Sequence, residues 1–149
     1  MGIGGLAFRI YWHVGSEADE TYGNGRLTEM HDETGSTQYC YDRLGNLVRR
    51  VEQHSAGPRF TLRGEYTLAN RLATLHYPSG ATVHYRRDAH GRIVGVDAEP
   101  TAGAAQVALI SAVDYLPFGP MNALTFGNGR RLERGFDTDY QIDRVGDSA

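Results

Sequence analysis

The chain has 149 residues, 40% of them hydrophobic, which permits a single domain with a thin core. Its 15 basic residues are all arginines and its 18 acidic residues bring the net charge to −3, so the basic footprint of a nucleic-acid-binding protein is lacking. No stretch approaches the roughly 18 uninterrupted apolar residues of a membrane-spanning helix, and the single cysteine, Cys40, excludes an internal disulfide framework and a thiolate metal site.

Short runs rich in valine, leucine, threonine, tyrosine and arginine alternate with segments that contain glycine, asparagine and aspartate, which is typical of an all-β chain. The first run, Leu6–His13, combines aromatic and β-branched residues without proline, and we expect it to be the segment most prone to aggregation. Further strands are predicted at residues 47–53 and 59–66 around the turn sequence HSAGP, and at 72–77 and 81–87 around PSG. The pattern predicts a continuous meander of long antiparallel hairpins.

A seven-residue motif recurs along the chain, and its glycine positions are separated by 20 to 28 residues. The clearest copy, YDRLGNL at Tyr41–Leu47, consists of an aromatic residue, an aspartate, two variable residues, a glycine, one further residue and an aliphatic residue. YTLANRL, RDAHGRI, YLPFGPM and FDTDYQI repeat this outline, and TYGNGRL keeps its second half. The repeat positions to which we assign a structural role are Tyr41, Asp42, Gly45, Leu47, Tyr66, Asn70, Leu72, Asp88, Gly91, Ile93, Tyr115, Gly119, Phe136 and Asp137.

Each motif is predicted to form the turn of a hairpin, because aspartate bonds nearby backbone amides and glycine accepts a positive φ without a Cβ clash. Asn70 and Tyr140 replace the turn glycine and Arg87 replaces the tyrosine of the third copy, so we expect those turns to be less regular. We predict a single repeat array over residues 1–149, truncated at both ends, with an exposed loop at residues 97–106. Because a truncated sheet exposes unpaired strand edges, we expect the isolated chain to self-associate.

The YDRLGNL and RDAHGRI motifs, the DETGSTQYCYD run before the first of them and the later YLPFGPMNALTFGNG segment resemble the YD repeats of the rearrangement hot spot (Rhs) family. The resemblance covers nearly the whole chain. It implies an all-β YD-repeat array whose long antiparallel hairpins form a strip of a spirally wound β-sheet shell. In bacterial Rhs proteins such a shell encloses a C-terminal toxin, and secretion systems deliver the polypeptide to competitors.

The partners implied by this resemblance are the flanking repeats and the C-terminal domain of the same longer polypeptide, together with secretion-system components. The parent protein is expected to be secreted or delivered to another cell. Neither nucleic acid nor membrane insertion is expected.

Motifs for catalysis or cofactor binding are not found, so we expect no enzymatic activity, no cofactor and no metal site. His76 and His84 flank the PSG turn, where a hairpin would bring them face to face, but the pattern supplies no third ligand and favours a structural role. The two Gly-Asn-Gly sequences at residues 23–25 and 127–129 lack the spacing of a phosphate loop and are predicted to be hairpin turns. Two carboxylate pairs are best explained as turn formers: Asp32 with Glu33, and Asp137 with Asp139.

The leading hypothesis from the sequence is a structural repeat segment of an Rhs-type shell without catalysis of its own. The alternative is a cell-surface binding module that contacts a glycan or a protein through its repeated tyrosines, because aromatic rings stack on the apolar faces of sugars. An enzyme fragment is a distant third hypothesis, since the candidate catalytic residues are scattered.

Overall fold

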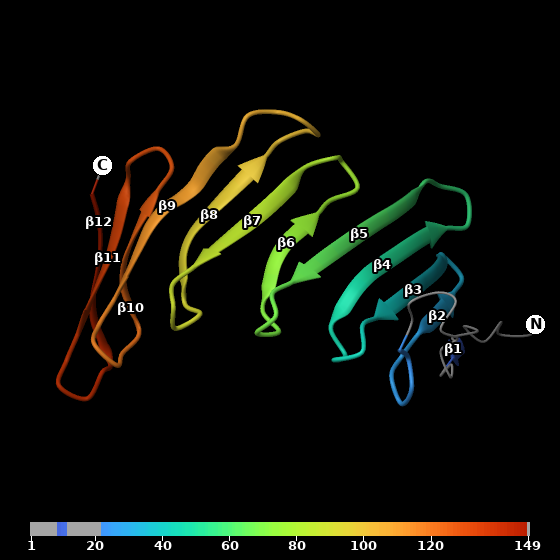
Figure 1. The fold of residues 1–149 in the computed structure, drawn as a ribbon, viewed down its shortest axis with the longest axis horizontal. Coiled ribbons are helices and arrows are strands. Elements are labelled where there is room, and N and C mark those ends of the chain that lie inside the picture. The colour runs from blue at the N-terminus through green and yellow to red at the C-terminus, as the bar shows by residue number, and fades with distance from the viewer. Residues whose placement is uncertain (1–8, 12–21, 149) are drawn as a thin grey trace, which may run out of the picture. The chain divides into compact units, whose positions relative to one another are not determined.

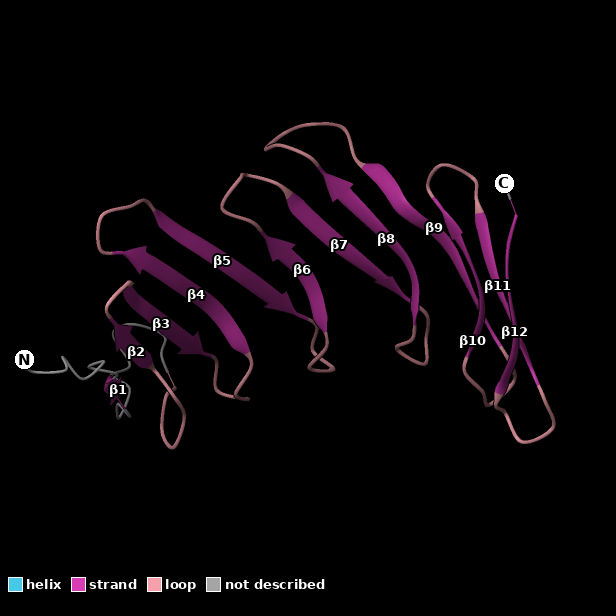
Figure 2. Ribbon diagram, turned by 180° about the vertical axis from the view of Figure 1, so that it is seen from behind, coloured by secondary structure: helices cyan, strands magenta, loops and turns pink. Residues whose placement is uncertain are grey.

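The computed structural model describes residues 9–11 and 22–148, so most of the Leu6–His13 segment lies outside the described residues. All regular elements in these ranges are β-strands, which confirms the all-β prediction (Figure 2). The described residues contain no helix that is long and apolar enough to cross a bilayer. The chain divides into two compact units, residues 1–78 and 79–149.

Unit 1 is an antiparallel sheet in which each described strand pairs with the next one along the chain (Figure 1). The predicted strands at 47–53, 59–66 and 72–77 are confirmed to within one residue at each end. The strands of unit 1 are β1 (Arg9–Tyr11), β2 (Glu29–Asp32), β3 (Gly35–Tyr41), β4 (Leu47–His54), β5 (Arg59–Tyr66) and β6 (Leu72–His76).

Unit 2 repeats this arrangement with the same antiparallel neighbour pairing. The strand predicted at 81–87 corresponds to β7. The loop predicted at 97–106 is shorter in the structure: residues 97–99 still belong to β8, where they pair with β7, and the exposed connection spans 100–106. The strands of unit 2 are β7 (Thr82–Arg87), β8 (Ile93–Glu99), β9 (Val107–Tyr115), β10 (Met121–Phe126), β11 (Arg131–Phe136) and β12 (Ile142–Ser148).

The two faces of each sheet differ in polarity, because side chains alternate across a strand and the register assigns each one to a face. In unit 1 the polar face includes Glu29, Gln38, Arg49 and Glu65, and the opposite face includes Tyr39, Val48, Leu62 and Leu75. In unit 2 the polar face includes His84, Arg86, Asp97 and Glu99, and the opposite face includes Tyr85, Val96, Ile110, Leu124 and Leu132.

Each unit consists of one layer, since the described strands within it contact only their neighbours in the sheet. The core is accordingly thin: the buried hydrophobic side chains are small or medium-sized, and no described large side chain is completely buried. Long polar side chains lie flat on the sheet instead. The Arg86 Nε donates to Asp97 Oδ2 at 2.6 Å and its Nη2 donates to the Ser111 carbonyl at 3.2 Å, so this arginine of β7 bridges to β8 and β9. It crosses Gly95, where a Cβ would stand 2.1 Å from the Arg86 Nη2.

Candidate functional site

The repeated motifs form a row of turns with a common hydrogen-bond pattern. In YDRLGNL the Asp42 N–H donates to the Asn46 carbonyl and the Gly45 N–H to the Asp42 carbonyl, both at 3.0 Å. This is the pattern of a type I turn followed by a residue in the left-handed conformation, which closes a hairpin with a bulge. The same two backbone bonds recur in the other four full copies, in which the residues at the aspartate position are Thr67, Asp88, Leu116 and Asp137.

The aspartate at the start of a turn holds the loop through its carboxylate. Asp42 Oδ1 accepts the N–H groups of Leu44 at 2.9 Å and Asn46 at 2.8 Å. Desolvation tends to raise the pKa of the Asp42 carboxyl, but the hydrogen bonds from the Asn46 side chain and from the backbone outweigh it and lower the pKa. Asp88 has a further donor, because Arg92 Nε lies 2.8 Å from its Oδ2.

Acid is therefore expected to weaken the third turn. The hydrogen bond from the Arg92 side chain, followed by those from backbone N–H groups, lowers the pKa of Asp88 in the folded chain. The folded state thus binds fewer protons than the unfolded state, in which an aspartate has a pKa of about 3.9. The stabilisation is present above that value and is lost as the pH falls through the folded pKa.

The measurement is the urea midpoint between about pH 6 and pH 3 for the wild type and for Asp88→Asn, which keeps an oxygen acceptor but cannot ionise. We expect the midpoint of the wild type to fall more steeply with acid. Parallel curves for the two proteins would contradict the assignment.

In four of the five full copies the residue in the glycine position adopts the left-handed conformation, whether or not it is glycine. Gly45 has φ 88° and Gly91 φ 79°, while Asn70 and Tyr140 both have φ 61° and keep the same backbone bonds. The expectation that the turns at Asn70 and Tyr140 are less regular is therefore wrong, because both residues keep the two backbone bonds and the left-handed φ.

The irregular turn is the one that retains its glycine. In YLPFGPM the positive φ falls on Phe118, at 58°, one residue before Gly119. Pro117 fixes its own φ near −65° at the second position of a turn, and a type II turn then requires a positive φ at the third position. Phe118 is completely exposed, so its side chain contributes little packing to offset the strain.

The tyrosines of the motifs connect successive repeats. The Tyr41 hydroxyl donates to the Leu27 carbonyl at 2.9 Å, and the Tyr66 hydroxyl donates to the Leu47 carbonyl at 3.2 Å. In unit 2 the Tyr115 hydroxyl donates to the Ile93 carbonyl at 2.7 Å. In each case the acceptor is the aliphatic residue that ends an earlier motif. Desolvation raises the pKa of Tyr41 and Tyr66, so both hydroxyls remain protonated donors at neutral pH.

Arginines stack on two of these tyrosines. The guanidinium carbon of Arg26 lies 5.6 Å from the Tyr41 ring centroid, and that of Arg92 lies 4.7 Å from the Tyr115 ring centroid. Both arginines directly follow the glycine position of the preceding motif. The cation–π contact therefore joins the same two motifs as the hydrogen bond from the tyrosine hydroxyl. Sequence reasoning missed these contacts between motifs. The signal that could have predicted them is that the aliphatic residue ending one motif is followed by the tyrosine that begins a later motif.

Replacing Tyr115 with phenylalanine tests the connection between repeats. The substitution removes the hydroxyl that donates to Ile93 and keeps the ring under Arg92, so we expect the free energy of unfolding to fall by about 1 kcal/mol. The measurement is urea unfolding, monitored by far-UV circular dichroism. The matched control is Tyr140→Phe, because Tyr140 is 55% exposed and should change little. Equal changes in the free energy of unfolding for the two substitutions would show that the hydrogen bond of the Tyr115 hydroxyl does not stabilise the connection between repeats.

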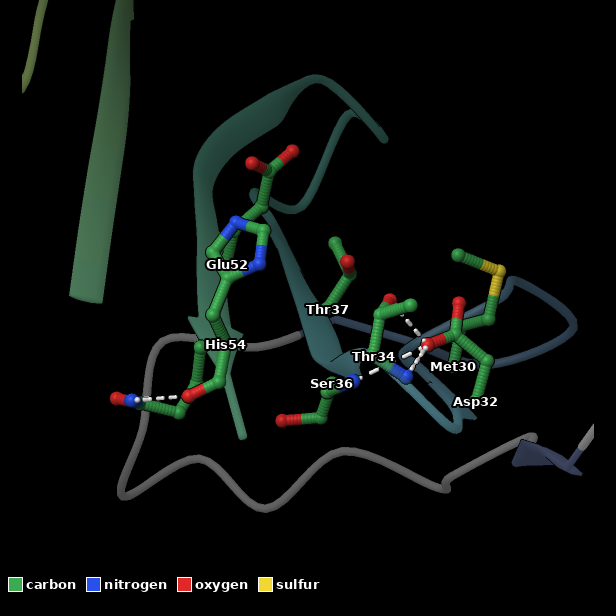
Figure 3. Close-up of a pocket in the computed structure, with 9 residues that line it drawn as sticks. Met30, Asp32, Thr34, Ser36, Thr37, Glu52 and His54 are labelled. Atoms are coloured by element: carbon green, nitrogen blue, oxygen red, sulfur yellow. Dashed lines mark hydrogen bonds between the residues drawn. The ribbon is translucent and has the colours of Figure 1, made fainter. Parts of the chain in front are cut away.

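One candidate for a ligand site is a depression of about 200 Å³ over the β2–β3 hairpin and the end of β4 (Figure 3). Its Asp32 Oδ1 accepts hydrogen bonds from the Thr34 N–H at 2.7 Å, from the Thr34 hydroxyl at 2.5 Å and from the Gly35 N–H at 3.1 Å. The His54 ring packs edge-on against Phe60, with centroids 6.0 Å apart. The Asp32 carboxylate is thus bonded to the turn of its own hairpin, so we assign it a structural role.

The other candidates for chemistry also have neighbours that explain them. His76 Nε2 lies 3.0 Å from Glu65 Oε1, and His84 Nε2 lies 3.8 Å from Glu99 Oε1, so each histidine faces a carboxylate within its own unit. Asp137 Oδ1 accepts the N–H groups of Asp139 and Gln141 and closes the last turn. Cys40 is buried and accepts hydrogen bonds from Arg49. Among the described residues, no group of three or more histidines, cysteines, aspartates or glutamates is arranged to hold a metal ion.

Comparisons with known proteins agree with the repeat. Residues 22–56, which contain YDRLGNL, match the RHS Repeat family model. A search of curated proteins found no significant match. Among solved structures, the crystal structure of TcdB2-TccC3 superposes with a TM-score of 0.82 at 15% identity, covering 95% of this chain and 8% of that chain.

Two further structures are similar. The crystal structure of TcdB2-TccC3-Cdc42 gives a TM-score of 0.78 at 15% identity, and the Photorhabdus luminescens Tc holotoxin pore gives 0.79 at 16% identity. Each match covers 94% of this chain and 8% of that chain. At such identities the likeness establishes the fold, and this chain spans about 8% of the length of the chains it matches.

Proposed function

We propose that this chain, whose residues 22–56 match the RHS Repeat family model, is a stretch of wall in an Rhs-type shell that encloses the C-terminal toxin of the same longer polypeptide and serves in interbacterial competition. Its partners are the flanking repeats and the enclosed domain, and secretion-system components deliver the parent protein to another cell. The chain itself performs no catalysis. Its contribution is to separate the enclosed polypeptide from the surrounding solution.

The observation that supports a wall is the bond from each motif tyrosine to an earlier motif. Tyr41, Tyr66 and Tyr115 direct their hydroxyls to backbone carbonyls of a preceding repeat instead of toward a shared cleft. These three repeats are therefore joined to an earlier repeat by a side chain as well as by strand pairing, which supports a long one-layer sheet. The similarity in fold to the Photorhabdus luminescens Tc holotoxin pore, in which this chain covers 8% of the matched chain, supports this proposal.

The binding-module alternative receives less support. The repeated tyrosines that would stack on a sugar have their hydroxyls bonded to the backbone, and Arg26 and Arg92 lie against two of the rings. These tyrosines therefore contribute to the contacts between repeats, which leaves them less available to a sugar.

The absence of lysine from residues 1–149 permits a direct test of containment. A protease specific for lysine cannot cleave this wall segment, so digestion of lysine sites after the repeats reports only on access to the enclosed region. In the full-length protein we expect that region to resist the protease under conditions that degrade the same region expressed alone. Deleting residues 22–148 from the full-length protein should restore cleavage. Equal resistance with and without these residues would refute the proposed wall function, and specific retention of the purified chain on a glycan array would support the alternative.

A further inference from the structure

The turn that precedes β2 places an exposed asparagine directly before a glycine. Gly23, Asn24, Gly25 and Arg26 form a turn closed by the Arg26 N–H, which donates to the Gly23 carbonyl at 2.9 Å. Gly25 has φ 70°, and a Cβ built on it would meet no atom within 4 Å, so the space around this peptide is open. Asn24 is exposed. The attacking nitrogen of Gly25 and the side-chain amide of Asn24 therefore lie in a loop segment outside the strands and open to water.

We propose that Asn24 is a site of spontaneous deamidation, a covalent modification that converts it to isoaspartate or aspartate. The backbone nitrogen of Gly25 attacks the side-chain carbonyl carbon of Asn24, a carbon–nitrogen bond forms, and the bond from that carbon to Nδ2 breaks. Ammonia leaves with the proton that the backbone nitrogen gives up. Water then opens the five-membered imide at either carbonyl, which yields the two acids without any oxidation or reduction.

A second Asn-Gly sequence in the same chain provides an internal comparison. Asn128–Gly129 lies in the β10–β11 turn, where the Gly129 N–H donates to the Phe126 carbonyl at 3.0 Å and Asn128 Oδ1 accepts the Arg130 N–H at 3.1 Å. Both reacting groups are held by hydrogen bonds, and the Thr125–Arg131 pair closes the hairpin beside them. In the Asn24 turn the closing bond uses the N–H of Arg26 instead of that of Gly25. The nitrogen that attacks at Asn128 must first give up its turn hydrogen bond, whereas the nitrogen that attacks at Asn24 takes no part in the closing bond of its turn.

The modification adds a negative charge and, in the isoaspartate product, an extra backbone carbon before Gly25, two residues ahead of Arg26. The Arg26 Nη1 donates to the Tyr22 carbonyl at 3.0 Å, and its guanidinium lies over Tyr41 and the Gly45 turn. A shifted Arg26 loosens the first contact between repeats. Deamidation at this position thus acts on the repeat connection itself.

The experiment follows the purified protein during incubation in mildly alkaline buffer, with intact mass and peptide mapping as readouts. We expect a gain of about 1 Da per event, located in the peptide that contains Asn24, and a rate at Asn128 about tenfold lower, because breaking one or two hydrogen bonds costs that factor. The variant Asn24→Gln should abolish the early mass gain, whereas Asn128→Gln should leave it unchanged.

The same incubation in denaturant serves as the control for intrinsic reactivity. There both sites are expected to react at similar rates, since both are followed by glycine. Reaction of Asn128 at the same rate as Asn24 in the folded protein, or an Asn24 that stays intact in the folded protein while it reacts in denaturant, would overturn the proposal.

Discussion

Replacing Gly127 with alanine is expected to lower the free energy of unfolding by about 3 kcal/mol, the upper part of the range for an overpacked site. Gly127 lies at the end of β10, where its N–H donates to the Leu109 carbonyl at 2.9 Å. A Cβ at this position would stand 1.6 Å from the carbonyl oxygen of Ala108 and 2.6 Å from its carbon. Backbone atoms of β9 cannot rotate away as a side chain does, so the two strands must separate.

The measurement is the midpoint of urea unfolding, and the matched control is Gly146→Ala in β12. A Cβ on Gly146 would meet no atom within 4 Å, and the residue lies in a fully exposed strand. We expect its midpoint to stay close to that of the wild type. If Gly127→Ala proves as mild as the control, the close approach of β9 and β10 is incorrect.

Replacing Gly45 with valine should cost about 2 to 3 kcal/mol for two separate reasons. Its φ of 88° is unfavourable for a β-branched residue. In addition, a Cβ at this position would stand 2.2 Å from the Arg26 Nη2, so the substitution displaces the guanidinium that stacks on Tyr41. Comparing the urea unfolding of Gly45→Val with that of Gly45→Ala separates the clash from the backbone strain, because alanine introduces the clash with less backbone strain than valine.

The control for this turn is Leu44→Ala, since the Leu44 side chain is 67% exposed. Arg43 looks equally neutral from its place in the sequence, yet its Nε donates to the Tyr22 hydroxyl at 2.7 Å and its guanidinium lies 5.5 Å from that ring. An Arg43→Ala variant would therefore test a second contact. A Gly45→Val variant that unfolds at the same urea concentration as Leu44→Ala would rule out the left-handed turn.

The sequence predicted the local structure well because each hairpin is encoded within a short stretch. Periodic strand residues and turn residues placed β4 and β5 within one residue of their observed ends. The left-handed position was also predictable at Gly45 and Gly91, since glycine marks it. Tyr140 escaped this reasoning because a tyrosine does not mark a left-handed position, although Tyr140 has φ 61° and keeps both turn hydrogen bonds.

Contacts between repeats were less predictable than the repeats themselves. Whether a tyrosine hydroxyl points to water or to the Ile93 carbonyl depends on how far one hairpin is shifted along the next, and the bulge beside each turn sets that shift. The same limit applies to Arg86, whose side chain crosses Gly95 and joins the three consecutive strands β7, β8 and β9. Periodicity reports which face a residue occupies but not how far its side chain reaches.

Because every described strand within a unit contacts only its neighbours, the sheet behaves as a one-dimensional chain of coupled hairpins. In such a system the free energy is close to a sum of terms for single hairpins and for adjacent pairs. Protection against amide hydrogen exchange should then decline in steps toward the ends of each unit, instead of disappearing in one global event. Insertion or deletion of a whole hairpin changes two boundaries and leaves the remaining ones intact, so length can vary among arrays of this kind without a new fold being required.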